Sequence, residues 1–368
     1  MTTTTRLEGL DFARFIAFVG MVLVNFTVAM GVEAGAEGQG SFLATSFVGG
    51  LEGRAAATFV VLAGIGLGLA ANKAVNNLEF NDQLIWLTTK RALFLLAIGL
   101  LNSLIFDADI LHYYALYFFF GVFFIRMSSS GLIFSIIFLI VGFVIMLFTL
   151  DYDVGWDWKT YTYKNFWTLE GFITNLFFNG WHPVIPWLAF FLFGILLSRL
   201  SLDQVQTQLQ LFTFGLIALL TVEGLSIFTL ALLSGAEQDL LDIATTEPLP
   251  PMPFYMIAGM ASACMVLAFS LWVSSLFAKS PRLSKIFGFK LSTQIGRQTL
   301  TLYVAHILFG MGTLEYLGLL DGQNASGTTD DAIIASGIFI FATGLYVWAY
   351  SKFFTRGPIE NLMRLITR

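Results

Sequence analysis

Apolar stretches long enough to cross a lipid bilayer recur from one end of this chain to the other. A helix needs roughly 20 mostly apolar residues to cross a hydrocarbon core about 30 Å thick. Lipid offers the backbone no hydrogen-bond partners, so only helices and closed barrels span it, and long continuous apolar runs are typical of helices. The sequence therefore predicts an all-α fold, a polytopic membrane helix bundle.

The hydropathy pattern predicts about ten transmembrane helices. Their expected ranges are 12–32, 55–72, 92–106, 111–126, 132–150, 184–200, 210–234, 253–278, 299–317 and 331–354. Charged residues make up only 12% of the chain and hydrophobic residues 57%, whereas soluble domains carry roughly 25% charged residues. We therefore expect a single transmembrane domain over residues 1–368 rather than separate soluble domains.

The charges between these segments alternate in sign. One set of connections is basic, with Arg126, Arg199, Lys279 and Lys290, and the other is mostly acidic, with Asp107, Asp151, Asp153 and Asp242. Because Lys and Arg accumulate in cytoplasmic loops, the alternation predicts that both termini are cytoplasmic. Neither set forms a compact basic patch, so nucleic acid is not an expected partner.

The stretch DADILHYYAL at 107–116 places ionisable groups between two apolar runs. Asp109 and His112 are three residues apart, so on a helix they share a face. A carboxylate beside an imidazole fixes its tautomer and raises its basicity, which suits a general base. The alternative is a polar helix cap at the water interface, with Asp109 capping and His112 hydrated.

Further polar groups lie in the first and second spans. Asp11, Arg14 and Asn25 follow one another in the first span; they predict either an interfacial ion pair or an anchor for a phosphate-bearing ligand, with Asn25 reaching a cavity. Glu52 and Arg54 begin the second span, and Arg54 needs an anionic partner: Glu52, Asp107, Asp109 or a substrate.

Two further places in the sequence carry candidate site residues: the segment WHPVIPW at 181–187 and the ninth predicted span. Two prolines after His182 predict an irregular start to the sixth span, before Trp187. The ninth span carries His306, which near mid-membrane needs a buried partner. His112 and His306 are therefore the two candidate bases.

Several stretches together resemble the YeiB-like family of multi-pass bacterial membrane proteins. They are LDFARFIAFVGMVLVN at 10–25, EGRAAATFVVLAG at 52–64, DILHYYAL at 109–116, PVIPWLAFFLFG at 183–194, GRQTLTLYVAHIL at 296–308 and FFTRGPIENLMR at 353–364. That family is similar to heparan-α-glucosaminide N-acetyltransferase within the transmembrane acyltransferase superfamily. Phe15 and Asn102 depart from the family pattern, which often has a glycine and a histidine there.

The resemblance implies an acyltransferase of the bacterial inner membrane. It would move an acyl group from cytoplasmic acyl-CoA, most simply acetyl-CoA, to an extracytoplasmic glycan or a small hydroxyl- or amine-bearing acceptor. The implied catalytic residues are His112, Asp109, His306 and Arg54. The implied donor-binding residues are Arg14, Arg297, Asp11, Tyr303 and Asn25, and the implied acceptor-binding residues are Tyr114 and Trp187. From their places in the sequence, His182 and Glu52 are added as candidate acceptor-binding residues.

The expected partners are the lipid bilayer, acyl-CoA and the acceptor, with a homodimer left open and no metal. The alternative function is a transporter or exporter of a small amphipathic solute that uses buried Glu223, His306 and Arg54 as coupling groups. The two hypotheses differ in ligand: an acyltransferase binds CoA, whereas such a transporter responds to an ion gradient.

Overall fold

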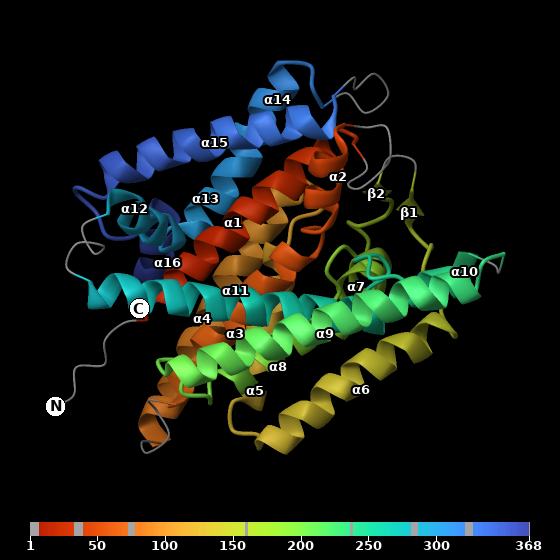
Figure 1. Ribbon diagram of the computed structural model, residues 1–368, viewed down its shortest axis with the longest axis horizontal. Coiled ribbons are helices and arrows are strands. Elements are labelled where there is room, and N and C mark those ends of the chain that lie inside the picture. Colours follow the sequence, from red (N-terminus) through yellow and green to blue (C-terminus); the bar gives the residue numbers. More distant parts are fainter. Residues whose placement is uncertain are drawn as a thin grey trace. The chain divides into compact units, whose positions relative to one another are not determined.

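The computed structural model describes residues 7–32, 40–72, 78–158, 161–235, 238–280, 286–320 and 327–367. In these ranges the chain is almost entirely helical, and its only sheet is a two-stranded antiparallel hairpin (Figure 1). The chain divides into two compact units, whose boundaries fall within α3, α9 and α11, between α8 and α9, and after α16. The prediction of a single transmembrane domain over 1–368 stays a prediction.

The first unit contains residues 7–59, 202–213 and 264–366 among those described. Its helices are α1 (Glu8–Ala29), α2 (Phe42–Gly49), α12 (Phe287–Gly296), α13 (Thr299–Ala305), the π-helical turn η3 (His306–Met311), α14 (Gly312–Tyr316), α15 (Thr329–Tyr350) and α16 (Pro358–Ile366). α1 packs against α12, α13 and α15, so it is the central helix of this unit. The turn before α15 is a capping box, in which Thr328 and Asp331 exchange hydrogen bonds.

The second unit contains residues 60–201 and 214–263 apart from the gaps in the described ranges. Its elements are α4 (Leu78–Asn102), α5 (Leu111–Phe124), α6 (Ser129–Leu147), β1 (Trp156–Asp157), β2 (Thr162–Tyr163), α7 (Leu169–Thr174), the π-helical turn η1 (Asn175–Asn179), α8 (Val184–Leu197) and α10 (Gln238–Ala244). α4 and α5 form a tight antiparallel pair, and α8 packs against α5 and α6.

Three long helices contribute residues to both units. They are α3 (Arg54–Asn72), α9 (Val205–Leu232) and α11 (Pro253–Lys279). Within the second unit α3 approaches α8 closely, because a Cβ on Gly64 would lie 2.0 Å from the Phe191 carbonyl oxygen, and one on Gly194 would lie 2.1 Å from that of Val61. The small residues of the second predicted span therefore permit close helix packing, as expected from the sequence.

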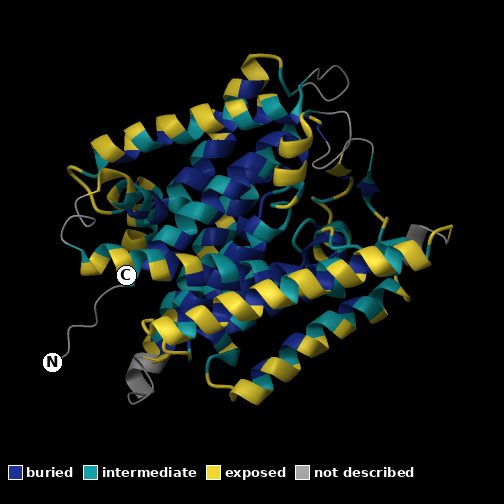
Figure 2. Cartoon of the chain, in the orientation of Figure 1, coloured by how far each residue is buried: buried dark blue, intermediate teal, exposed yellow. Residues whose placement is uncertain are grey.

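Burial is uneven among the helices (Figure 2). α6 buries only Leu132, Ile136 and Phe143, and its remaining apolar side chains are partly or fully exposed. α8, in contrast, buries most of its residues, including Trp187, Phe190 and Phe191. Exposed apolar faces of this kind suit contact with lipid rather than water.

Seven helices among the described residues are long and apolar enough to cross a membrane. An eighth span is reached if the helices of 169–179 and 184–197, bent by 49°, count as one. The chain is thus a multi-pass, all-α membrane protein, as predicted, but a count of ten spans is not confirmed, and the orientation of the termini stays a prediction. α5, with 14 residues, is short for a span.

Two segments differ from the sequence expectation in their bounds. The third predicted span begins near 92, whereas α4 begins at Leu78, because the polar start of this helix continues directly into its apolar part. The ninth predicted span, 299–317, is built from α13, η3 and α14 rather than one regular helix. The irregular start of the sixth span is confirmed, since Ile185 has non-helical backbone angles within α8.

Candidate functional site

Asp109 lies directly before α5 and contacts the start of that helix with its carboxylate. Its Oδ2 accepts hydrogen bonds from the backbone N–H groups of Leu111 (2.8 Å) and His112 (3.3 Å). Its Oδ1 accepts one from Nδ2 of Asn102 at 3.1 Å. Asp109 is fully buried and Asn102 is 4% exposed. Both carboxylate oxygens of Asp109 are therefore hydrogen-bonded, as expected of a buried polar side chain.

The imidazole of His112 lies against the same carboxylate. Nδ1 of His112 is 3.2 Å from Oδ2 of Asp109 and 3.3 Å from Oγ of Ser103. The Ser103 hydroxyl donates to the Gly99 carbonyl, so toward His112 its oxygen is an acceptor. Both neighbours of Nδ1 therefore accept, and the ring proton belongs on Nδ1.

The other ring nitrogen of His112 carries the lone pair. Nε2 is buried and has no hydrogen-bond partner among the described residues, and the whole residue is 0% exposed. A buried polar atom without a partner is uncommon and indicates a missing water or ligand. Nε2 is therefore an unpartnered nitrogen atom inside the protein, on a ring that Asp109 holds through Nδ1.

The second hypothesis for residues 107–116 was a polar helix cap at the water interface, with Asp109 capping and His112 hydrated. Asp109 does cap α5, but His112 is buried rather than hydrated. Capping and orientation of the ring are thus performed by one carboxylate. Asn102, a departure from the family pattern, is a hydrogen-bond donor to that carboxylate.

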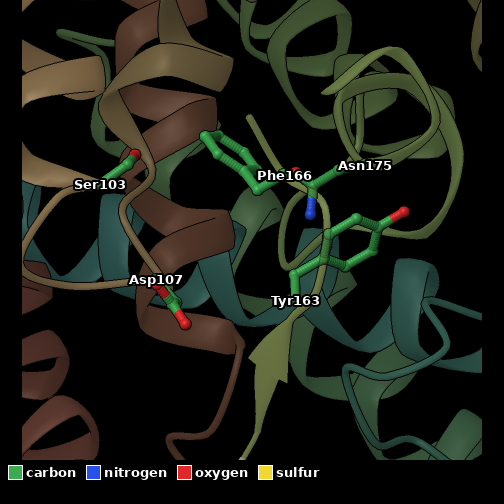
Figure 3. A pocket seen from close by; sticks show the side chains of 5 residues that line it. All are labelled: Ser103, Asp107, Tyr163, Phe166 and Asn175. Atoms are coloured by element: carbon green, nitrogen blue, oxygen red, sulfur yellow. The ribbon is translucent and has the colours of Figure 1, made fainter. Parts of the chain in front are cut away.

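A small pocket opens beside this group (Figure 3). It holds about 220 Å³ of space not filled by protein atoms, part of it open to solvent, and is lined by Ser103, Asp107, Tyr163, Phe166 and Asn175. Two of these residues also contact His112: Ser103 at Nδ1, and Phe166 through its ring edge, with centroids 5.7 Å apart. Burial raises the pKa of Asp107 above its ordinary value.

Sequence reasoning did not single out Ser103, Phe166 or Asn175. Ser103 comes from the turn after α4 and Asn175 from the π-helical turn η1, so only the folded chain brings them beside α5. A signal was present for Asn175, which is an amide in an apolar segment and is 2% exposed. Its Oδ1 accepts a hydrogen bond from the Tyr113 hydroxyl at 2.5 Å.

The segment between η1 and α8 lies against α5 and carries the predicted acceptor-binding residue His182, and the start of α8 carries another, Trp187. The Tyr117 hydroxyl donates to the His182 carbonyl at 2.6 Å. The His182 ring meets the Tyr113 ring edge-on, with centroids 5.9 Å apart, and the Trp187 ring at 4.6 Å. Trp187 is fully buried. His182 and Trp187 thus share one aromatic cluster with Tyr113 and Tyr117, two of the three tyrosines of α5.

Tyr114 lies on α5 next to this cluster. Its ring packs against Tyr117 (5.7 Å) and Phe118 (6.4 Å), and the residue is partly exposed. The ring of Tyr113, and not that of Tyr114, lies against the His112 ring, with centroids 4.0 Å apart and the planes tilted by 37°. The role of Tyr114 in acceptor binding stays a prediction.

In the first unit, Asp11 is the centre of an ion-pair cluster. Its Oδ1 accepts from Arg14 Nη1 at 2.8 Å and its Oδ2 from Arg297 Nε at 3.0 Å. Arg297 also bonds Glu8 through Nη2 at 3.2 Å. Asp11 is 1% exposed, whereas the side chains of Arg14 and Arg297 are 28% and 25% exposed. Three of the predicted donor-binding residues are therefore brought together.

Asn25, Tyr303 and His306 form a second group in the first unit. Nε2 of His306 lies 3.0 Å from Nδ2 of Asn25, and Nδ1 lies within hydrogen-bond distance of the Tyr303 carbonyl. A carbonyl only accepts, so the proton sits on Nδ1 and Nε2 accepts from the Asn25 amide. Both nitrogens of this buried ring are bonded. This is the buried partner that His306 was expected to need.

Comparison with known families gives one match. Residues 6–231 match the family described as "Heparan-alpha-glucosaminide N-acetyltransferase, catalytic". The chain belongs to this family. Heparan-alpha-glucosaminide N-acetyltransferase-like proteins are membrane acetyltransferases, so this membership and the apolar helices agree. No curated protein and no solved structure matches the chain.

The range that matches the N-acetyltransferase family contains both candidate-site residues of the Asp109–His112 pair, but only some of the candidate residues of the first unit. Asp109, His112, His182 and Trp187 all fall within 6–231, together with Asp11, Arg14, Asn25 and Arg54. Arg297, Tyr303 and His306 lie beyond it. Membership in the N-acetyltransferase family therefore covers His112 but does not extend to the other candidate base.

The structure also shows the contacts of Arg54 and Glu223 and bears on a possible metal site. Arg54 Nη1 donates to the Gly50 carbonyl at 3.3 Å, and Glu52 precedes it in the same turn; catalytic and acceptor-binding roles for them stay predictions. Glu223 Oε2 accepts a hydrogen bond from Thr246 at 3.1 Å, and the transporter alternative is not tested by this contact. The described parts of the chain hold no group of three or more His, Cys, Asp or Glu residues that could bind a metal ion.

Proposed function

We propose that this chain is a membrane-embedded acyltransferase that moves an acyl group from cytoplasmic acyl-CoA, acetyl-CoA first, to an extracytoplasmic glycan or a small hydroxyl- or amine-bearing acceptor. The observation that carries the proposal is the unpartnered Nε2 of His112, buried beside Asp109 and next to a pocket. Membership in an acetyltransferase family supports the same class of reaction.

His112 is the general base of the proposed reaction. The acceptor hydroxyl or amine gives its proton to Nε2 of His112 as its oxygen or nitrogen attacks the thioester carbon. The C–O or C–N bond forms, the C–S bond breaks, and the CoA thiolate takes the proton from Nε2 of His112 and leaves as the thiol, which restores the base. Asp109 stabilises the imidazolium that forms, because its carboxylate already bonds Nδ1.

His306 is less suited to this task. Its Nε2 lone pair accepts from Asn25 and its Nδ1 bonds the Tyr303 carbonyl, so neither nitrogen is free to take a proton from a substrate. The contact between Asn25 and His306 also has a structural explanation, because a buried imidazole without hydrogen-bond partners would cost about 1–3 kcal/mol of stability. We assign His306 a structural role.

Arg14 and Arg297 are the donor-binding residues of the proposal. Both are partly exposed and charged, which suits binding of the phosphates of CoA. Asp11 and Glu8 already pair with them, so a phosphate competes with these carboxylates for the same guanidinium groups. Weak binding of CoA alone, strengthened by the acyl-pantetheine arm, is expected from this balance.

The direct test is thermal stability of the purified protein with and without CoA and acetyl-CoA. A ligand that binds only the folded state at 100 times its Kd adds about 2.7 kcal/mol, and the melting temperature rises. The shift should shrink in Arg297→Ala and in Arg297→Lys, and persist in Lys290→Ala, an exposed cation of the same helix. No shift with either compound at millimolar concentration in the wild type would contradict the proposal.

A further inference from the structure

The short helix α16 turns its acidic side chain toward the protein. Glu360 accepts hydrogen bonds from the backbone N–H groups of Leu300 (2.9 Å) and Thr301 (3.2 Å), at the start of α13. The N–H group of Ile359 donates to the Thr301 hydroxyl at 3.0 Å. These bonds hold the first turn of α16 against α13 and so determine which side of the helix faces away from the protein.

The side of α16 that faces away from the protein is apolar. Leu365 and Ile366 follow Leu362 by three and four residues, so the three side chains lie on one face, and all three are exposed. A helix at a water-exposed surface normally has the opposite arrangement, with its apolar face toward the core and its charged residues outward. The exposed apolar face of α16 therefore indicates a contact with lipid or with another protein.

The end of α15 shows where the membrane boundary lies. Tyr346 and Trp348 are exposed there, and the rings of Tyr346 and Tyr350 stack with centroids 5.4 Å apart. Nζ of Lys352 lies 3.7 Å from the centroid of the Trp348 ring. Tyr, Trp and Lys are typical of the level at which a transmembrane helix meets water. Only residues 351–357 separate α15 from α16, so α16 begins at the same level.

The charges beside this apolar face are positive. Lys352 and Arg364 are exposed and Arg356 is partly exposed. The one acidic residue of the segment 351–366 is Glu360, whose carboxylate bonds the start of α13. Cations next to an apolar helix face favour binding to the anionic headgroups of a membrane surface.

The charge also argues against a second copy of the chain as the occupant of this face. Two copies that met through α16 would bring the cations of one helix beside those of the other, and like charges at an interface cost stability. The polar edge of the helix is consistent with a boundary instead. Asn361 and Arg364 are three residues apart and exposed, so they lie on one side of the apolar face, where water and headgroups meet.

We propose that α16 is an interfacial helix that binds anionic phospholipid, with its apolar face among the acyl chains and Lys352, Arg356 and Arg364 at the headgroup phosphates. The 9 residues of α16 extend over about 14 Å, which is too short to cross a hydrocarbon core of roughly 30 Å. The helix therefore lies along the membrane surface. This inference does not depend on acyl transfer, because no residue of the proposed reaction takes part in it.

The first test measures the depth of α16 with a nitrobenzoxadiazole label on Leu365→Cys, in the full chain reconstituted into nanodiscs. The natural Cys264 is buried, so the labelled wild type gives the background. Asn361→Cys, on the polar edge of the same helix, is the matched control. Lipids with a nitroxide on the acyl chain should quench the label at position 365 more than at 361, and iodide in the water should quench in the opposite order.

Equal iodide quenching at the two positions would show that the apolar face lies in water and would overturn the inference. Weak quenching at position 365 by both agents would also overturn it, because the face would then be covered by protein, as in a dimer. Where Leu365→Cys does not fold, Leu362→Cys on the same face replaces it.

The second test measures the charge contribution as a melting temperature in two kinds of nanodisc, phosphatidylcholine alone and phosphatidylcholine mixed with phosphatidylglycerol. A ligand that binds the folded state stabilises it, so the wild type should melt at a higher temperature in the anionic discs. The difference should shrink when Lys352→Gln and Arg364→Gln are combined, and persist in Lys164→Gln, at an exposed cation that follows β2. Equal melting temperatures of the wild type in both discs, or an equal loss in Lys164→Gln, would overturn the assignment of anionic lipid.

Discussion

Asp109 Oδ2 lies 3.2 Å from His112 Nδ1 at the start of α5, and neither residue is exposed. The same oxygen accepts the N–H groups of Leu111 and His112, so the carboxylate is fixed by the helix that also carries the ring. The orientation of the His112 ring thus depends on Asp109, directly before α5, and on the first turn of that helix.

Asp109→Asn should therefore reduce catalysis far more than stability. The amide oxygen can still accept from the helix N–H groups, but it bears no charge to stabilise an imidazolium on His112. We expect kcat for acetyl transfer to fall by roughly 10²–10⁴-fold with a smaller change in KM. Asp203→Asn, an exposed carboxyl, is the matched control. Unchanged kcat in Asp109→Asn would contradict the assigned role.

Tyr113→Phe should weaken the fold of the second unit. The substitution removes the hydroxyl that donates to Asn175 Oδ1 at 2.5 Å and leaves that oxygen buried without this donor. A loss of about 1–3 kcal/mol in the free energy of unfolding is expected, measured as a lower melting temperature in detergent. Tyr316→Phe, at a residue that is 89% exposed, should show no loss. An equal effect of both would refute the explanation.

Glu360 gives a prediction on pH. Its carboxylate accepts hydrogen bonds from the Leu300 and Thr301 N–H groups and the Thr301 hydroxyl, and burial raises its pKa above the ordinary value despite them. A raised carboxyl pKa means that the folded state binds the proton more tightly. Its contribution to stability is therefore present at low pH and is lost as the pH rises through the folded-state pKa.

Glu360→Gln removes this titration. The melting temperature of the variant minus that of the wild type should consequently increase from about pH 5 to about pH 8, above the unfolded-state pKa near 4.3. Glu360→Ala, which loses the acceptor as well, should be less stable than both at every pH. A difference that decreases with rising pH would show that the folded state favours the ionised form.

Gly296 should not tolerate a side chain. A Cβ at this position, where α12 meets α1, would lie 1.8 Å from the Asp11 carbonyl oxygen. Gly296→Ala is expected to cost about 3 kcal/mol or more, because the backbone of α1 must move. Gly337→Ala, in α15 with nothing within 4 Å of the new Cβ, should instead be neutral or stabilise by roughly 0.5–1 kcal/mol. Equal melting temperatures for the two variants would contradict the packing described.

The helical segments could be predicted from the sequence because a bilayer imposes a simple rule on composition. Every predicted span coincides with helix in the structure, among them α1, α6 and α15. The regularity of the spans could be predicted only in part. The prolines around Ile185 indicated the irregular start of the sixth span, whereas no residue pattern indicated the π-helical turn that begins at His306.

The candidate site shows the same division. Asp109 and His112 could be paired from the sequence because helix geometry joins residues three apart. Asn25 and His306 are 281 residues apart and Tyr113 and Asn175 are 62 apart, so nothing local indicates that they meet. The choice between the two candidate bases accordingly depended on which nitrogen atoms the fold leaves without a partner.

The most direct test of the central claim is acetyl transfer measured on His112→Gln and His306→Gln beside the wild type. The purified proteins, in detergent or nanodiscs, are given acetyl-CoA and amino-sugar or polyol acceptors, and acetylated product is quantified per folded protein. We expect transfer by the wild type, a loss of at least roughly 100-fold in His112→Gln, and retained transfer in His306→Gln despite lower stability. Transfer that persists without His112, or that depends on His306 alone, would contradict it.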